Sequence, residues 1–122
     1  MPYTPPVGTM LQLHTRLKHI VDNGGLNAEL SRAKKVAEYF RSNIKDLPYR
    51  LFSRSMPNAV TALTPTNGRS AYDVVVELIE KHNIFVCPNG GALKDMVFRV
   101  SHMGDVDTSY TDRLLTALRS MK

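Results

Sequence analysis

The stretch that decides the fold lies near the C-terminal end. It reads Gly90-Gly91-Ala92-Leu93-Lys94-Asp95-Met96-Val97-Phe98-Arg99-Val100-Ser101-His102-Met103-Gly104-Asp105. Because strand residues alternate between two faces, we expect Met96, Phe98 and Val100 to face a core. Arg99 then lies on the other face among apolar neighbours, where a guanidinium is costly unless an anion pairs with it. Such an arginine can hold a carboxylate with two parallel hydrogen bonds; an exposed arginine on an open sheet face is the alternative.

Outward from this stretch, hydrophobic spacing predicts four helices and four strands. The helices are expected over residues 7–22, 26–44, 70–82 and from Asp107 or Thr108 to 121, with Ser70 as an N-cap. The strands are expected over residues 49–52, 59–64, 84–87 and 96–101. The sequence therefore predicts an α+β fold. This is a two-layer sandwich in which a small, mostly antiparallel sheet of about four strands has helices packed on one face.

Each of the last three helices carries an apolar stripe that we expect to be buried. The stripes are Leu26, Leu30, Ala33, Ala37, Phe40 and Ile44; then Tyr72, Val75, Leu78 and Ile79; then Tyr110, Leu114, Leu118 and Met121.

Composition is that of an ordinary globular protein, with 122 residues, 43% of them hydrophobic and 22% charged. This length predicts a single domain over residues 1–122. No apolar run is long enough to span a membrane, and the N-terminus lacks the pattern of a secretory signal. The lone cysteine cannot form an internal disulfide, which favours a cytoplasmic location.

The net charge of +5 arises in the first half, where residues 1–61 carry nine Lys or Arg and four Asp or Glu. This asymmetry is typical either of a nucleic-acid surface or of helix faces solvated by basic side chains. No RNA-binding aromatic motif accompanies it, so we expect no nucleic acid and no membrane as partners.

Cysteine and histidine form no metal-ligand spacing, so no metal is expected. Cys87, in an apolar strand, is expected to be a small buried residue rather than a nucleophile. We expect the four histidines to be surface or capping residues; they are His14, His19, His82 and His102.

Taken in order, Leu93-Lys94 followed by Phe98-Arg99-Val100-Ser101-His102-Met103-Gly104 resembles the C-terminal signature of class V pyridoxal-phosphate-dependent aminotransferases of the alanine–glyoxylate and serine–pyruvate type. The segment Tyr3–Val7, followed by a helix and by Asn23-Gly24-Gly25-Leu26, is similar to that family's junction between large and small domains. The resemblance covers essentially the whole chain. Ser101 departs from it, standing where the family usually has glycine, and Pro88-Asn89 depart from its more glycine-rich loop.

The resemblance implies that Arg99 binds the α-carboxylate of the amino or keto acid substrate. It implies that Thr4 contacts the phosphate of pyridoxal 5'-phosphate across a homodimer interface; a residue leading into the first helix is the alternative for Thr4. The family's Schiff-base lysine lies in a large domain, and no lysine here has the matching context. The chain is thus expected to be the small domain of an aminotransferase acting on alanine- or serine-like amino acids and glyoxylate- or pyruvate-like keto acids, inactive alone. A non-catalytic α+β binding module using its basic half is the alternative.

Overall fold

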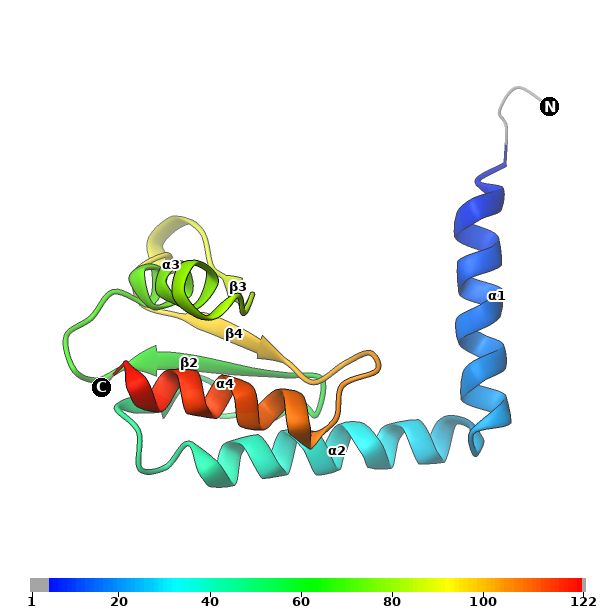
Figure 1. Ribbon diagram of the computed structural model, residues 1–122, viewed down its shortest axis with the longest axis horizontal. Coiled ribbons are helices and arrows are strands. Elements are labelled where there is room, and N and C mark those ends of the chain that lie inside the picture. The colour runs from blue at the N-terminus through cyan, green and yellow to red at the C-terminus, as the bar shows by residue number, and fades with distance from the viewer. Residues whose placement is uncertain (1–4, 122) are drawn as a thin grey trace. The chain divides into compact units, whose positions relative to one another are not determined.

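A computed structural model describes residues 5–121, so Thr4 lies outside the described part. Its elements follow the order α1 (Val7–Asp22), α2 (Gly25–Asn43), β1 (Tyr49–Leu51), β2 (Val60–Pro65), α3 (Ala71–His82), β3 (Cys87–Pro88), a 3₁₀ turn (Gly91–Leu93), β4 (Phe98–Ser101) and α4 (Thr108–Ser120) (Figure 1). The chain divides into two compact units between residues 32 and 33.

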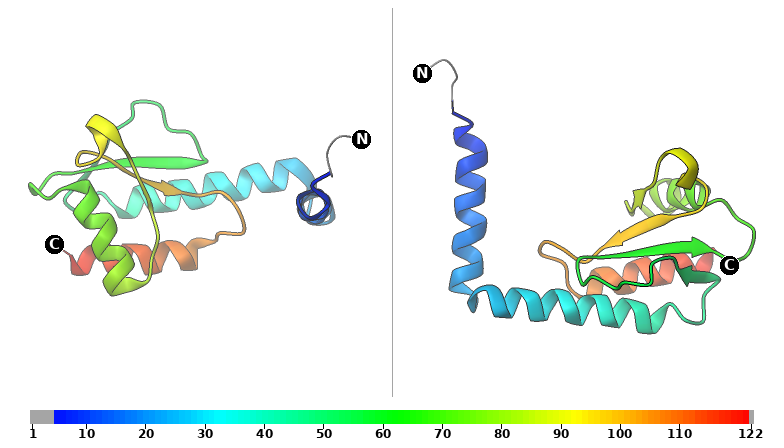
Figure 2. Two further views of the ribbon diagram at one scale, coloured as in Figure 1. Left: turned by 90° about the horizontal axis from the view of Figure 1, so that it is seen from above. Right: turned by 180° about the vertical axis from the view of Figure 1, so that it is seen from behind.

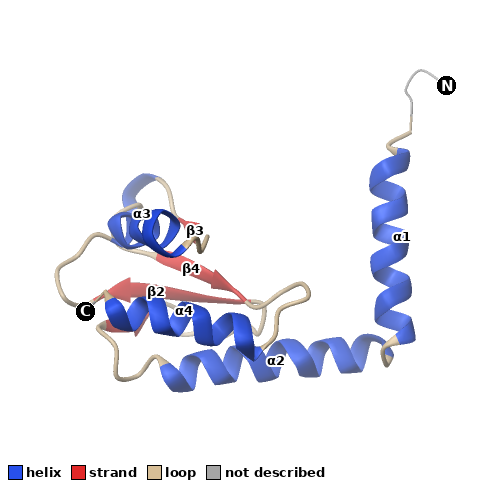
Figure 3. Cartoon of the chain, viewed as in Figure 1, coloured by secondary structure: helices blue, strands red, loops and turns tan. Residues whose placement is uncertain are grey.

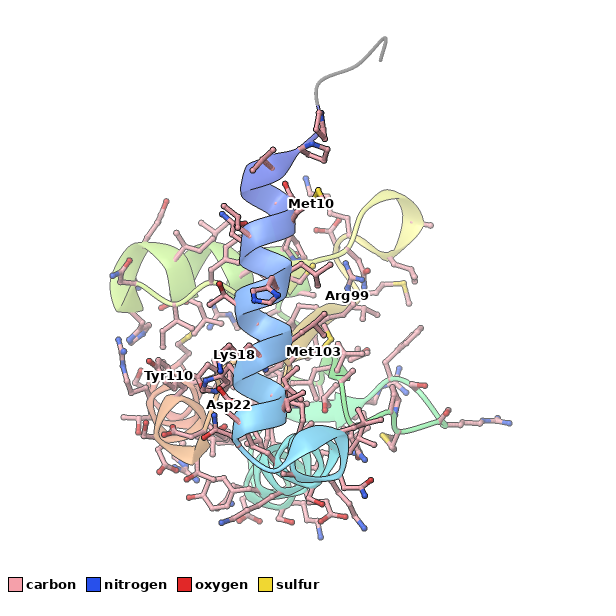
Figure 4. All side chains as sticks on the ribbon, turned by 90° about the vertical axis from the view of Figure 1, so that its right-hand side faces the viewer. Met10, Lys18, Asp22, Arg99, Met103 and Tyr110 are labelled. Carbon is pink, nitrogen blue, oxygen red and sulfur yellow. The ribbon has the colours of Figure 1, made fainter. Side chains whose placement is uncertain are left out.

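The first unit contains α1 and the first turns of α2. Glycine ends α1 as expected, with Gly24 in the left-handed region at φ 97°. Lys18 and Asp22, labelled on α1 in Figure 4, pair at 2.7 Å. None of the residues of α1 is buried. Most of its large apolar side chains are exposed, and so are two at the start of α2: Val7, Met10, Leu11, Leu13, Leu17, Val21, Leu26 and Leu30. The apolar stripe of this unit therefore has no partner among the described residues.

The second unit contains a four-stranded antiparallel sheet in the order β1-β2-β4-β3, with its helices drawn in Figure 3. The predicted α+β class and the antiparallel sheet are confirmed. One hydrophobic core joins α2, α3 and α4 to a single face of the sheet; seen from above, the helices lie on one side of the strands (Figure 2). Its fully buried large side chains include Phe40, Leu63, Phe98, Leu78 and Leu115.

The strand that carries Arg99 begins two residues later than predicted. Phe98 and Val100 face the core as expected, but the expectation for Met96 is wrong, because Met96 is 47% exposed and Val97 is buried instead. The backbone N–H groups of both residues donate to the carbonyl of Leu93, at 3.2 and 3.1 Å. This turn breaks the strand alternation before Phe98.

The predicted N-cap Ser70 is confirmed, because its side chain accepts from the backbone of Tyr72 and Asp73. Of the two expected starts of the last helix, Asp107 is the N-cap and Thr108 is the first residue of α4. Five stripe residues are exposed against expectation, namely Leu26, Leu30, Tyr72, Ile79 and Tyr110.

The short strand β3 also differs from the prediction. It covers Cys87–Pro88 rather than residues 84–87, and Phe85 is 75% exposed. The expectation that Cys87 is buried is wrong, since its thiol is free and exposed. None of the described helices is long and apolar enough to cross a membrane.

Candidate functional site

The candidate site lies on the sheet face opposite the helices. Antiparallel partners share a face, and Arg99 of β4 pairs with Ala62 on one side and with Cys87 on the other. The side chain of Arg50 lies on the same face, because Arg50 pairs with Thr64, two residues from Ala62. The residues on this face of the sheet are half-buried or exposed, whereas those on the other face belong to the hydrophobic core.

Arg99, labelled in Figure 4, is half-buried and bonded to the neighbouring strand β3. Its Nη2 donates to the carbonyl oxygen of Pro88 at 3.1 Å and to Sγ of Cys87 at 2.9 Å. Its Nε is enclosed and has no hydrogen-bond partner among the described residues. No carboxylate in residues 5–121 forms an ion pair with this guanidinium. The charge is therefore oriented by neutral acceptors, which leaves it able to bind an anion.

The two departures from the family pattern fit this geometry. Ser101 is in β4 and does not have a positive φ, and its hydroxyl accepts from the backbone N–H of Met103 at 3.2 Å. Pro88 supplies the carbonyl that holds Arg99. The side chain of Asn89 donates to the carbonyl of Val97 at 3.2 Å and so fastens the loop to the start of β4.

Beneath the end of this strand lies a buried polar group that the sequence did not predict. His102 is 1% exposed rather than a surface or capping residue, so that expectation is wrong for His102. Its Nε2 lies 2.8 Å from Oγ1 of Thr61, which also accepts from Nε of Arg41 at 3.0 Å. Burial, and secondly the charge of Arg41, lowers the pKa of His102 to about 4. A neutral imidazole thus joins β2, α2 and the loop after β4.

No group of three or more metal-binding side chains occurs among residues 5–121. The lysines that have partners lie in contacts away from Arg99: Lys18 with Asp22, Lys34 with Glu38, Lys81 with Glu77, and Lys94 over the ring of Tyr72. Within residues 5–121, these contacts bring no lysine together with Arg99. What the described residues provide at this face is a half-buried arginine that has no acidic partner among them.

No family model and no curated protein matches the chain. Solved structures do match it. An alanine–glyoxylate aminotransferase from Nostoc sp. is 26% identical with a TM-score of 0.89, over 98% of this chain and 32% of that one. A pyridoxamine–pyruvate aminotransferase from Mesorhizobium loti is 19% identical with a TM-score of 0.86, over 98% and 31%. A ureidoglycine–glyoxylate aminotransferase from Bacillus subtilis is 20% identical with a TM-score of 0.78, over 84% and 27%.

These likenesses extend across the helices and the sheet that carries Arg99, and they include a structure more than a quarter identical in sequence. The chain spans about a third of the length of the proteins it matches. The resemblance seen in the sequence is therefore confirmed by the structure: this chain is similar to a portion of the class V pyridoxal-phosphate-dependent aminotransferases.

Proposed function

We propose that the chain is the small domain of a cytoplasmic, homodimeric aminotransferase that uses pyridoxal 5'-phosphate. The whole enzyme transfers an amino group between an alanine- or serine-like α-amino acid and a glyoxylate- or pyruvate-like 2-keto acid. Its cofactor, when bound, supplies the chemistry of amino transfer and is held mainly by a large domain, with Thr4 contacting the phosphate. Arg99 binds the substrate carboxylate.

The observation that carries this proposal is the environment of Arg99. A half-buried guanidinium with no acidic partner in the described part of the chain loses hydration without gaining an ion pair. A substrate carboxylate provides the missing charge and forms hydrogen bonds about twice as strong as neutral ones. The role of Arg99 is to bind and orient the substrate, because its neutral contacts to β3 fix the direction of the guanidinium.

The exposed apolar stripe of α1 supports a second domain as partner. Leu13 and Leu17 are 58% and 53% exposed, and Met10 is 59% exposed. Contiguous apolar surface of this kind usually marks an interaction site. The matched enzymes are about three times as long as this chain, and we propose that the large domain of the same enzyme covers the stripe.

The binding-module alternative is less well supported by the structure. Several basic residues in the first half are occupied locally: Arg16 pairs with Glu29 at 2.6 Å, and Arg41 donates to Thr61 and to backbone carbonyls. A phosphate backbone would have to compete with these partners. Steeply salt-dependent binding of the chain to DNA or RNA would favour this alternative.

The proposal is tested by titrating the isolated chain with pyruvate and following arginine side-chain resonances by NMR. We expect saturable binding at Arg99 that is lost in Arg99→Gln. Arg50→Gln is the matched control, since Arg50 lies on the same sheet face but is exposed, and it should bind as wild type does. Equal binding by the two variants would refute the role of Arg99.

The isolated chain is further expected not to retain pyridoxal phosphate. Incubation with the cofactor followed by gel filtration should leave no cofactor absorbance in the protein fraction. A stable absorbance band in that fraction would contradict the assignment of the cofactor site to another domain.

A further inference from the structure

We infer that the Cys87 thiol occupies the place of a carboxylate oxygen on Arg99 and must be displaced when substrate binds, so that residue 87 sets the affinity of the site. The inference rests on the proposed carboxylate-binding role of Arg99.

A guanidinium has five N–H donors, one on Nε and two on each terminal nitrogen. Nη2 carries two hydrogens, and two acceptors lie within hydrogen-bond distance of it: Sγ of Cys87 at 2.9 Å and the carbonyl of Pro88 at 3.1 Å. Nε is enclosed and cannot reach a ligand. Two parallel bonds to a carboxylate need one hydrogen from each of two adjacent nitrogens. Hence Nη2 must release one of its two acceptors before Arg99 can form such a pair.

The acceptor that is released is the thiol. Sulfur is a weak acceptor, whereas a backbone carbonyl is a strong one. The carbonyl of Pro88 belongs to β3 and is fixed by the pairing of that strand with β4, while Cys87 is exposed and its thiol donates only a long bond, at 3.6 Å, to the same carbonyl. A carboxylate oxygen that replaces sulfur gains a charge-assisted bond, so Pro88 remains as the anchor and Cys87 gives way.

Residue 87 faces Arg99 directly across the strand pair, so its side chain competes with the ligand according to its strength as an acceptor. Alanine offers no acceptor, serine offers a stronger one than cysteine, and aspartate offers a permanent carboxylate. The inference therefore predicts that affinity for a small carboxylate decreases in the order Cys87→Ala, wild type, Cys87→Ser, Cys87→Asp.

The experiment is a pyruvate titration of these four proteins, monitored by the Nε–Hε resonance of Arg99 at constant ionic strength. We expect Cys87→Ala to bind about threefold more tightly and Cys87→Ser about threefold more weakly than wild type, the worth of one neutral hydrogen bond. Cys87→Asp should bind at least about tenfold more weakly, because an internal ion pair occupies Arg99. Since residue 87 is exposed, the amide spectra should remain those of the folded chain in all four.

Three outcomes decide the matter. The predicted order supports the inference. Weakest binding by Cys87→Ala, or equal binding by the alanine, serine and wild-type proteins, overturns it while leaving the carboxylate role of Arg99 intact. Absence of pyruvate binding in every protein, including Cys87→Ala, refutes the proposed role of Arg99 and the inference with it.

Discussion

Lowering the pH from 7.5 to 4.5 is expected to cost the folded chain about 2–3 kcal/mol of stability through His102 alone. The imidazole is buried, lies between Thr61 and the ring of Phe40, and has its pKa lowered from 6.5 to about 4 by burial and by Arg41. The folded state thus keeps this group neutral at a pH where the unfolded chain protonates it.

The sign follows from the number of protons bound. Between pH 6.5 and about 4 the unfolded chain holds more protons on residue 102 than the folded chain does. The stability that the neutral His102 contributes is therefore fully present above pH 6.5 and is lost as the pH falls toward 4. The largest possible loss from this residue is about 3 kcal/mol. Glu77, whose pKa is lowered to about 2 by its bonds to Lys81 and Arg69, loses its main contribution at lower pH.

The assay is urea unfolding at pH 7.5 and pH 4.5 for wild type and His102→Gln, whose side-chain amide can still reach Thr61 but does not titrate. The difference in unfolding free energy between the two pH values should be about 2–3 kcal/mol smaller in the variant. His14→Gln, at an exposed position, is the control and should match wild type. The same pH dependence in His102→Gln and wild type would refute the reasoning.

Substitutions at three further positions are measured by urea unfolding. Phe98→Ala should lower the free energy of unfolding by about 3–5 kcal/mol, because this fully buried ring packs on Tyr49; a loss below 1 kcal/mol would contradict the core assignment. Ser70→Ala should cost about 1 kcal/mol through loss of the N-cap of α3, whereas Ser70→Asn should be near neutral. Leu13→Ala should change stability by less than about 0.5 kcal/mol, since Leu13 is exposed; a larger loss would show that α1 is packed in the isolated chain.

Much of the fold was predictable because local signals and tertiary packing agree. The apolar alternation at Phe98 and Val100 is the alternation of β4, and Ser70 and Asp107 mark the starts of α3 and α4. Periodicity alone does not say how far a buried face extends. Leu26 has the spacing of a core residue, yet it is exposed in the first unit.

The candidate site was predicted only in part. Arg99 could be singled out because a charged residue between apolar strand neighbours calls for a partner. The partners it has could not be foreseen, since they depend on the register of β3 and β4, which places Cys87 opposite Arg99. Burial of His102 was likewise missed, because it depends on Thr61 and Arg41, which are distant in sequence. The strand alternation itself pointed to neither contact.

The most direct test of the central claim is steady-state transamination by an enzyme assembled from this chain and a large domain supplied in trans. The account predicts that Arg99→Gln lowers kcat/KM for an amino acid by about 10- to 100-fold, the loss of charge-assisted bonds worth about 1.5–3 kcal/mol, while Arg50→Gln stays within about twofold of wild type. Equal kcat/KM values for Arg99→Gln and wild type would contradict it.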